Sequence, residues 1–256
     1  MTHFTKLPAR ALLLLAILFI AIQSPAQKPA NVPLDKMPVA LETDYALSAL
    51  PPQLRPGATI YLLDPAKGYY VSRKGSNGFI CFVMRTAWEW AEFRNDIVTA
   101  ISYDAEGART IFPIYAAAAA MRASGKFTAL QTRNIIINRI KKGIYKAPAH
   151  PGISYMLGPM MRTYPGTPAS NKVLTMHMPH YMFYACYLTN ADIGNIPNGK
   201  ADGPFLVNPE AMFLGGERKA PYAYIIVPAG EKEAAKIEAD NKVLLKRLAD
   251  YNPILK

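Results

Sequence analysis

Hydrophobic and polar residues group into strand-like runs in the first half of the chain. Three runs rich in aromatic and β-branched side chains, at 58–63, 69–73 and 79–85, are separated by the segments DPAKG and KGSNG. Proline, asparagine and glycine supply turn geometries that other residues resist, so runs bounded in this way are typical of β-strands. The pattern predicts a three-stranded antiparallel meander, and it indicates a further strand at 97–103.

The pattern changes to helical periodicity after this region. Thr110 is placed to cap a helix over 111–124, and Gly125 is placed to end it. The segment TALQ at 128–131 is a capping box, which opens a second helix that Gly143 ends. Two helices joined by so short a loop form an αα-hairpin. Its apolar side chains need a partner, and the predicted sheet is the obvious one.

Shorter signals lie on either side of these elements. A helix is predicted over 38–50, because prolines open and close this segment. Short apolar runs at 153–157 and 223–227 indicate buried strands, although the region 145–219 is otherwise rich in proline, glycine and asparagine. The segment 231–251 is amphipathic, with acidic residues near its start and basic residues near its end, as the helix dipole favours.

A hydrophobic leader precedes all of these elements. Basic residues come before a continuous apolar run of 12 residues at 11–22, and the small residues Ser24 and Ala26 come before the expected cleavage point. The run is shorter than the roughly 18 residues that a bilayer-spanning helix needs. The sequence therefore predicts a secreted or periplasmic protein with a signal peptide at 1–26, no transmembrane segment in the mature chain and a flexible lead-in at 27–37.

The mature chain is long enough for one large domain. Cleavage would leave 230 residues (256 minus 26), which can bury a sizeable core. No shift in composition divides them. We therefore expect a single α+β domain over 38–256, in which an antiparallel sheet packs against the αα-hairpin and the C-terminal amphipathic helix.

The chain is also basic. Its formal net charge is +11, and removal of the two basic residues of the leader, which holds no acidic residue, leaves +9. A surplus of this size favours anionic envelope components or an acidic ligand as partners. The basic residues are scattered along the chain rather than clustered, so nucleic acid is not an expected partner.

The stretch TMHMPHYMFYACYLTN at 175–190 concentrates the side chains with most chemical potential. His177 and His180 are separated by two residues, with methionines beside them. Imidazole and thioether ligands together suit copper, so copper or zinc binding by the two histidines is one hypothesis. Pro179 blocks the regular helix that would place both rings on one face, and methionine is also a common core filler. A purely structural role for both histidines therefore stands beside the metal hypothesis.

The tyrosines of this stretch suggest a ligand site instead. Tyr184 and Tyr187 recur at a helical interval, and tyrosine combines an apolar face with a polar tip. If exposed, such rings could stack on sugars; if buried, they would be core residues. Asn190 and Asp192, in the turn-rich segment that follows, would lie at the rim of a pocket. These four residues are the predicted ligand-binding residues.

Catalytic motifs are incomplete. Ser154, in GISYMLG, lacks the glycine two residues later that a nucleophile elbow needs. A dyad of His180 or His150 with Ser154, Cys81 or Cys186 would have to be assembled by the fold. The same two cysteines are the only ones in the chain, and in an exported protein they can form a disulfide or remain buried thiols.

Several sequence blocks together resemble a group of exported bacterial proteins without an assigned activity. The blocks are SNGFICFV (76–83), YDAEG (103–107), PGISYMLGP (151–159), PHYMFYACYLTNADIG (179–194) and AYIIVP (223–228). The resemblance covers most of the mature chain. It implies export and a single domain, and it supplies no catalytic residues.

The function that these observations favour is noncatalytic: an envelope-associated protein that binds a small molecule or a glycan in a pocket lined by residues 150–194. The first alternative is a copper or zinc binding protein that uses His177 and His180. The second is a hydrolase-like enzyme that uses His180 with a nucleophile the sequence does not identify.

Overall fold

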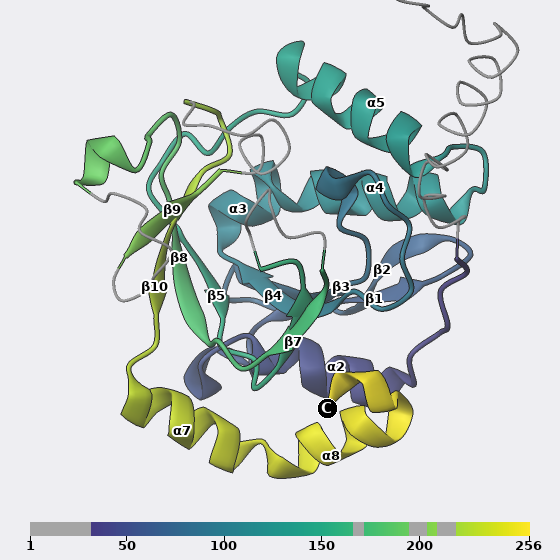
Figure 1. Ribbon diagram of the computed structural model, residues 1–256, viewed down its shortest axis with the longest axis vertical. Helices are drawn as coiled ribbons and strands as arrows, with labels where there is room; N and C mark the ends of the chain where they lie inside the picture. Colours follow the sequence, from purple (N-terminus) through teal and green to yellow (C-terminus); the bar gives the residue numbers. More distant parts are fainter. Residues whose placement is uncertain (1–31, 166–171, 195–203, 209–218) are drawn as a thin grey trace, which may run out of the picture. The chain divides into compact units, whose positions relative to one another are not determined.

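The computed structural model describes residues 32–165, 172–194, 204–208 and 219–256. These residues fold into two β-sheets with helices on both sides of the larger sheet (Figure 1). The mixture of helices and mainly antiparallel strands confirms the predicted α+β class, with the strands divided between two sheets.

The larger sheet has six strands in the spatial order β2-β1-β3-β4-β6-β7. In chain order, these are β1 (Thr59–Asp64), β2 (Gly68–Arg73), β3 (Ile80–Met84), β4 (Val98–Tyr103), β6 (Met161–Thr163) and β7 (Leu174–Met176). The smaller sheet is antiparallel throughout and has the order β5-β8-β10-β9. Its strands are β5 (Ile153–Met156), β8 (His180–Tyr184), β9 (Phe205–Val207) and β10 (Tyr224–Pro228).

Six α-helices accompany these strands in the described residues. They are α2 (Val39–Ser48), α3 (Ala105–Thr110), α4 (Phe112–Ala123), α5 (Ala129–Lys141), α7 (Glu231–Asp240) and α8 (Lys242–Tyr251). Four short 3₁₀ turns add to them: η1 (Pro52–Leu54), η2 (Trp88–Trp90), η3 (Ala191–Ile193) and η4 (Pro253–Leu255).

The two sheets are joined where β4 passes β5. Ser102 Oγ accepts a hydrogen bond from Tyr155 N (3.1 Å) and donates one to Tyr155 O (3.0 Å). Ser154 Oγ donates to Ser102 O (2.5 Å), and both serines are fully buried. Beyond them, Asp104 Oδ2 accepts from Ile153 N (2.7 Å). Side-chain oxygens thus replace part of the backbone ladder between two strands that belong to different sheets.

The predicted three-stranded meander is wrong in one respect. β1 and β2 form the expected antiparallel hairpin, but β3 lies beside β1 and runs parallel to it. The connection from β2 to β3 crosses the start of β1, where Ser76 N and Asn77 N both donate to Gly57 O. Gly75 permits this crossing, because a Cβ at that position would lie 2.2 Å from Gly57 O. The segment KGSNG is therefore a crossing connection rather than a hairpin turn.

The helix predicted over 111–124 is present as α4, but its predicted cap is wrong, because a further helix, α3, precedes it. α3 begins after Asp104, whose carboxylate accepts from Gly107 N (2.9 Å). Thr110 lies at the end of α3 and donates to Glu106 O (2.7 Å). An aspartate is as good a cap as a threonine, and the chain uses the earlier one. The helical direction then changes at Ile111, before α4.

The start of α5 and the ends of both helices of the αα-hairpin are as predicted. Thr128 Oγ1 accepts from Gln131 N (3.2 Å) while Gln131 Oε1 accepts from Thr128 N (2.8 Å), which confirms the capping box of α5. Gly125 follows α4 with a φ of +65°, and Gly143 follows α5 with a φ of +67°. Both glycines adopt the left-handed conformation that ends a helix at little steric cost.

Only the first helix of this hairpin covers the sheet. Gly68 of β2 lets α4 approach closely, because a Cβ there would lie 3.2 Å from the Ala120 backbone. α5 lies outside α4 (Figure 1) and buries only Thr132 and Ile136. The expectation that the hairpin packs on the sheet is thus confirmed for α4, while α5 packs on α4 and η2.

The predicted C-terminal helix is broken at Asn241. The Asn241 side-chain amide donates to Ile237 O (2.7 Å), in place of the backbone amide that a continuous helix would bring there. α8 then buries Leu244 and Leu248 in the cluster that it shares with α2, on the face of the larger sheet opposite α4. α7 buries no side chain completely.

The strand β3 shows how the core is divided. All five of its residues are buried. Ile80, Phe82 and Met84 belong to the cluster with α4, whereas Cys81 and Val83 belong to the cluster with α2. This alternation is what a pleated strand covered on both faces requires. The inner face of the smaller sheet completes the first of these two clusters.

The described part of the lead-in, residues 32–37, is held against the domain. Val32 O accepts from Arg122 Nη2 (2.7 Å), Val32 N donates to Phe93 O (3.3 Å), and Met37 is 2% exposed. The rest of the predicted lead-in and the predicted signal peptide lie outside the described residues.

Within the described residues, no helix is both long enough and apolar enough to cross a bilayer.

One buried acid makes the stability of this fold depend on pH. Glu42 on α2 is 3% exposed and accepts a hydrogen bond from Leu63 N (2.8 Å). Burial raises the pKa of its carboxyl from 4.5 to about 7. The unfolded chain loses this proton near pH 4.5, so the contribution of Glu42 to the free energy of unfolding falls as the pH rises from 4.5 to 7.

The variant Glu42→Gln removes this titration and keeps the acceptor for Leu63. We expect its free energy of unfolding to exceed that of the wild type by about 1–3 kcal/mol at pH 8, and the two proteins to be equally stable near pH 4. Urea unfolding at both pH values measures the difference. A variant less stable than the wild type at pH 8 would contradict the assignment.

Candidate functional site

The segment 175–190 does not form one element. It begins in β7, at the edge of the larger sheet, turns through Met178 and Pro179, and continues as β8 in the middle of the smaller sheet. The two histidines therefore have different surroundings.

The His177 ring is exposed and bridges two elements. Nδ1 lies 2.6 Å from Pro159 O, just before β6, and Nε2 lies 3.1 Å from Ala234 O of α7. Both ring nitrogens thus face carbonyl oxygens of the protein. His177 positions α7 against the end of β7.

The His180 ring is buried, with 2% of the residue exposed. Its Nδ1 donates to Met178 O (2.7 Å), because a carbonyl oxygen can only accept. Burial lowers the pKa of this ring, which favours its neutral form. His180 opposes Met156 on β5 and Pro228 on β10 across the ladder.

The metal hypothesis gains no additional ligand from the fold. Among the described residues, no group of three or more histidine, cysteine, aspartate or glutamate side chains could hold a metal ion. Copper or zinc binding by His177 and His180 stays a prediction, and it would need thioether ligands.

Tyr184 points inward and binds Asp104. Its hydroxyl donates to Asp104 Oδ1 (2.8 Å). Gly107 and Gly152 make room for the ring, because a Cβ at these positions would lie 2.1 Å from Tyr184 Oη and 2.5 Å from Tyr184 Cε2. Burial, and then the neighbouring Asp104, raise the pKa of Tyr184, so the hydroxyl stays protonated. This predicted ligand residue links β8 to the start of α3.

The other predicted ligand residues lie in the turn after β8. Tyr187 is 55% exposed and has a φ of +64°. The Asn190 side chain accepts from Leu206 N (2.9 Å) and donates to Leu206 O (3.3 Å), as a neighbouring strand would. Tyr184 points inward, so it lies apart from the other three predicted ligand-binding residues, Tyr187, Asn190 and Asp192.

Asp192 organises the same turn. Its Oδ2 accepts from Thr189 N and Thr189 Oγ1 (both 2.8 Å), and Lys219 Nζ lies 3.4 Å from it. The hydrogen bonds from Thr189, and then the charge of Lys219, lower the pKa of the Asp192 carboxyl.

The proposed nucleophiles of the hydrolase hypothesis have structural roles. Ser154 Oγ is committed to Ser102 O. Both cysteines are free thiols, so no disulfide joins them. Cys81 is fully buried, and burial raises its pKa to about 12; burial also raises the pKa of the half-buried Cys186. Neither thiol has the lowered pKa of a reactive cysteine.

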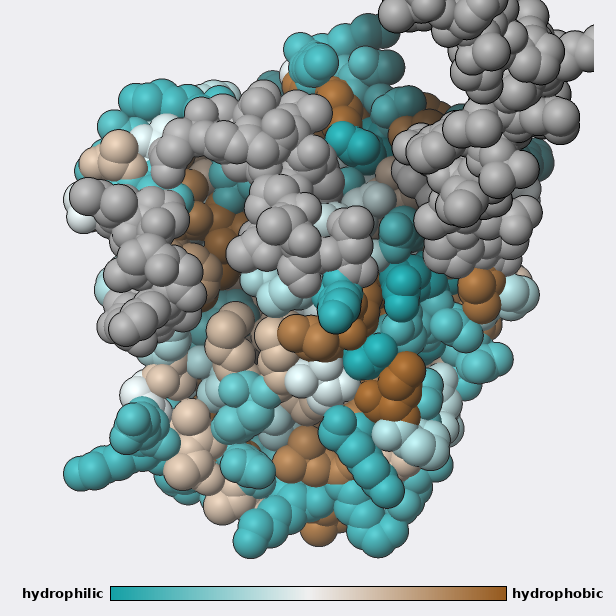
Figure 2. All heavy atoms as spheres, viewed as in Figure 1, coloured by the Kyte–Doolittle hydropathy of each residue, from teal (hydrophilic) through white to brown (hydrophobic). Residues whose placement is uncertain are grey.

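A surface groove lies where β7 faces the C-terminal helices, and we call it the β7–α8 groove. Its volume is about 630 Å³. It is lined by Pro159, Met160, Thr175, Met176, His177, Glu238, Leu245, Lys246, Ala249, Asp250, Leu255 and Lys256. In Figure 2, apolar atoms gather over β7 and α8 with hydrophilic ones between them.

The groove combines an apolar lining with charged side chains of both signs. Methionine, leucine, proline and alanine side chains supply the apolar part, and Lys246 pairs with Asp250 at 2.5 Å. Beside the lining residues, Leu174 and Ile254 are 44% and 45% exposed. Such a surface suits a molecule with an apolar body and a polar end.

Sequence reasoning identified one residue of this groove as a site residue, His177. The amphipathic pattern of 231–251 predicted that Leu245 and Ala249 lie on a helix, but it carried no information on which strand that helix would face. Pro159 and Met160 gave no signal as site residues.

No protein-family model matches this sequence, and the searches of curated proteins and of solved structures found no match either.

The contacts of Asp104 give a first test of this region. Asp104→Ala removes the acceptor for Gly107 N, Ile153 N and Tyr184 Oη, and should lower the free energy of unfolding by about 2–4 kcal/mol. Asp240→Ala, in an exposed pair with Lys236, should change it by less than about 0.5 kcal/mol. If Asp104→Ala and Asp240→Ala changed the free energy of unfolding equally in chemical denaturation, Asp104 would not be joining α3, β5 and β8.

His180 gives a second test. His180→Asn keeps a donor for Met178 O but loses ring contacts, so it should be less stable than the wild type by about 1–2 kcal/mol at pH 8. Only the wild type loses stability when the unfolded chain takes up the histidine proton below pH 6.5. The difference in free energy of unfolding between the wild type and His180→Asn should therefore be smaller at pH 5 than at pH 8, as measured by urea unfolding. A stability difference that does not change with pH would contradict the assignment of His180 as a buried neutral ring.

Proposed function

We propose that this protein is an exported, envelope-associated, noncatalytic binding protein that holds a small amphipathic molecule in the β7–α8 groove. The observation that carries the proposal is the groove itself. Its volume lies within the roughly 300–1,000 Å³ of small-molecule sites. One wall belongs to the 150–194 region that the sequence favours as a binding region.

The chemistry of the groove supports a ligand with an anionic end. Met160, Met176 and Leu245 offer apolar contact to the body of the ligand. Lys246 pairs with Asp250 on the lining, whereas Lys256 has no acidic partner among the described residues. Lys256 can therefore attract an anionic end, in keeping with the positive formal charge of the chain. The export and the envelope association rest on the leader sequence and on this charge.

The frame of the groove supports binding without catalysis. Both ring nitrogens of His177 lie within hydrogen-bond distance of carbonyl oxygens, Pro159 O and Ala234 O, and a neutral ring donates to one of them. The protein thus holds this ring in place rather than offering it as a free base. Ser154, the serine nearest to a nucleophile motif, is buried in the seam between the sheets.

The test uses 1-anilinonaphthalene-8-sulfonate, an anion with an aromatic body, in isothermal titration calorimetry. We expect saturable binding to the native protein with one site. Ala249→Trp fills the groove and should weaken binding at least tenfold. Val243→Trp places the same side chain on α8 at a position that is 75% exposed and outside the groove, and it should bind within about twofold of the wild type.

Cooperative thermal unfolding of both variants shows that each is folded. Absence of saturable binding to the wild type, or equal binding by the two variants, would overturn the groove as the binding site.

A further inference from the structure

The chain turns sharply where α5 ends, over residues 141–146, and we call this segment the 141–146 turn. Gly143 N donates to Ile140 O and Ile144 N donates to Arg139 O, both at 2.9 Å, while Gly143 has a φ of +67°. This is the Schellman pattern of helix ends, in which the residue after the glycine often packs back on an apolar side chain of the last helical turn. The side chain at that position is Arg139, so the pattern gives Ile144 no apolar partner.

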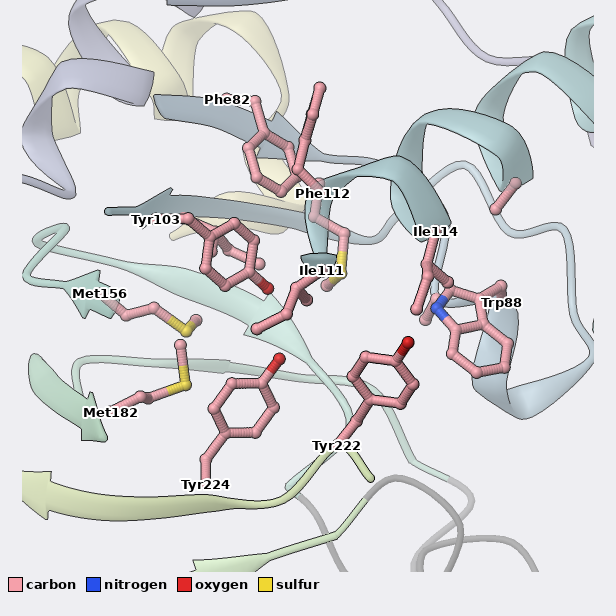
Figure 3. Close-up of a cluster of buried hydrophobic side chains, with 14 of the residues drawn as sticks. Phe82, Trp88, Tyr103, Ile111, Phe112, Ile114, Met156, Met182, Tyr222 and Tyr224 are labelled. Carbon is pink, nitrogen blue, oxygen red and sulfur yellow. The ribbon is translucent and has the colours of Figure 1, made fainter. Parts of the chain in front are cut away.

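Ile144 consequently stays on the surface of the protein. It is 62% exposed, whereas Ile136 of α5 is 0% exposed and Ile114 of α4 is 2% exposed. Figure 3 shows Ile114 directed into the core, among aromatic side chains. A single exposed isoleucine is ordinary on a protein surface, so its surroundings decide whether it marks a contact.

The turn is held firmly on the rest of the protein. Arg139 Nη1 donates to Tyr145 Oη (3.0 Å), and Arg139 Cζ lies 6.0 Å from the centroid of the Tyr145 ring. α5 is in turn packed on α4 and η2. Ile144 therefore lies on a fixed frame, and a partner that contacts it would have little of the chain to order.

Three exposed lysines lie around this isoleucine: Lys141, Lys142 and Lys146. None of the three forms an ion pair with a residue that the structure describes. The turn thus combines an apolar side chain with positive charges that the protein itself does not neutralise.

The positive charge extends over one side of the larger sheet. Residues 112–146, which include α4, α5 and most of the turn's neighbours, contain seven basic and no acidic residues. Residues 231–251, which include α7 and α8, contain five of each. α4 and α8 cover opposite faces of the larger sheet, and α5 lies outside α4 (Figure 1). This asymmetry turns the α5 side toward an anionic surface.

We infer that the 141–146 turn docks this protein on an anionic lipid surface. Ile144 inserts at the interface, and the three lysines lie against the phosphate groups. Apolar insertion and attraction to anionic headgroups are the two contributions that hold a surface-bound segment on a bilayer. A soluble polyanion would use the lysines but leave Ile144 in water, whereas an apolar protein surface would leave the lysines without counter-charges.

This inference deepens the envelope association of the proposed function and rests on that part of it, because it names the docking surface and the class of partner. It does not depend on the β7–α8 groove, which shares no residue with the turn.

The test measures co-sedimentation with vesicles of the chain that begins at Gln27, so that the hydrophobic leader cannot itself bind lipid. We expect binding to vesicles made of equal parts phosphatidylglycerol and phosphatidylcholine, and no binding to vesicles of phosphatidylcholine alone. Added salt should weaken the binding, because it screens the attraction between the lysines and the headgroups.

The contribution of charge is tested by a triple variant that combines Lys141→Gln, Lys142→Gln and Lys146→Gln. It should bind the anionic vesicles about 100-fold more weakly than the wild type, since each lysine near such a surface contributes about fivefold.

A second triple variant is the matched control for net charge. Lys232→Gln, Lys236→Gln and Lys242→Gln remove the same charge from exposed positions of α7 and α8. Because these positions lie away from the turn, this variant should bind within about threefold of the wild type.

The contribution of apolar insertion is tested by Ile144→Ser, which should weaken binding at least about fivefold. Val243→Ser is its control, because Val243 on α8 is 75% exposed and should not touch the lipid, so binding should stay within about twofold of the wild type. Cooperative thermal unfolding of each variant shows that it is folded.

Failure of the wild type to bind the anionic vesicles would overturn the inference, as would equal losses in the two triple variants. Wild-type binding by Ile144→Ser would show recognition of charge alone, as by a polyanion. A dimer that this variant loses in the absence of lipid would assign the turn to a second copy of the chain instead. Because the groove is tested with a soluble anion and without lipid, either proposal can fail without the other.

Discussion

The hydrogen bonds of Ser102 hold the two sheets together, and most other features of the protein depend on them. Ser102 both donates to and accepts from the backbone of Tyr155, while Ser154 returns a bond to Ser102 O. Loss of one partner of such a buried bond would leave the other unpaired, at a cost of about 1–3 kcal/mol. Through them β5 is fixed beside β4, and β8, β10 and β9 follow from β5.

This seam determines where the distinctive residues lie. It turns the inner face of the smaller sheet toward α4, so Met156, Met182 and Tyr224 become part of the main core. The segment 175–190 spans from one sheet to the other, and its residues separate accordingly. His177 remains outside and frames the β7–α8 groove, while His180 and Tyr184 enter the interior.

The sequence pattern was sufficient for most elements and insufficient for their pairing. The capping box of α5, the β1–β2 hairpin and the strands at β5 and β10 follow from local residues and were predicted. The parallel pairing of β1 and β3 was not predicted. It depends on the close contact of Gly75 with Gly57, and these two residues are too far apart in the sequence for a local turn to bring them together.

The same limit applies to the candidate sites. His177 could be singled out from its own chemistry, but the groove also needs α8, and its position depends on packing against α2. Long-range contacts create the groove, and a periodic pattern in the sequence does not record such contacts.

The crossing connection over β1 constrains the order in which the larger sheet can assemble. β1 and β2 close through a short local turn, which restricts little of the chain, whereas β1 and β3 must pair across a longer loop. Residues 75–77 donate hydrogen bonds to Gly57 O and Thr59 Oγ1, so their conformation depends on the position of the start of β1. The N-terminal hairpin thus provides the edge on which β3 pairs, and β4 and the rest of the larger sheet follow from β3.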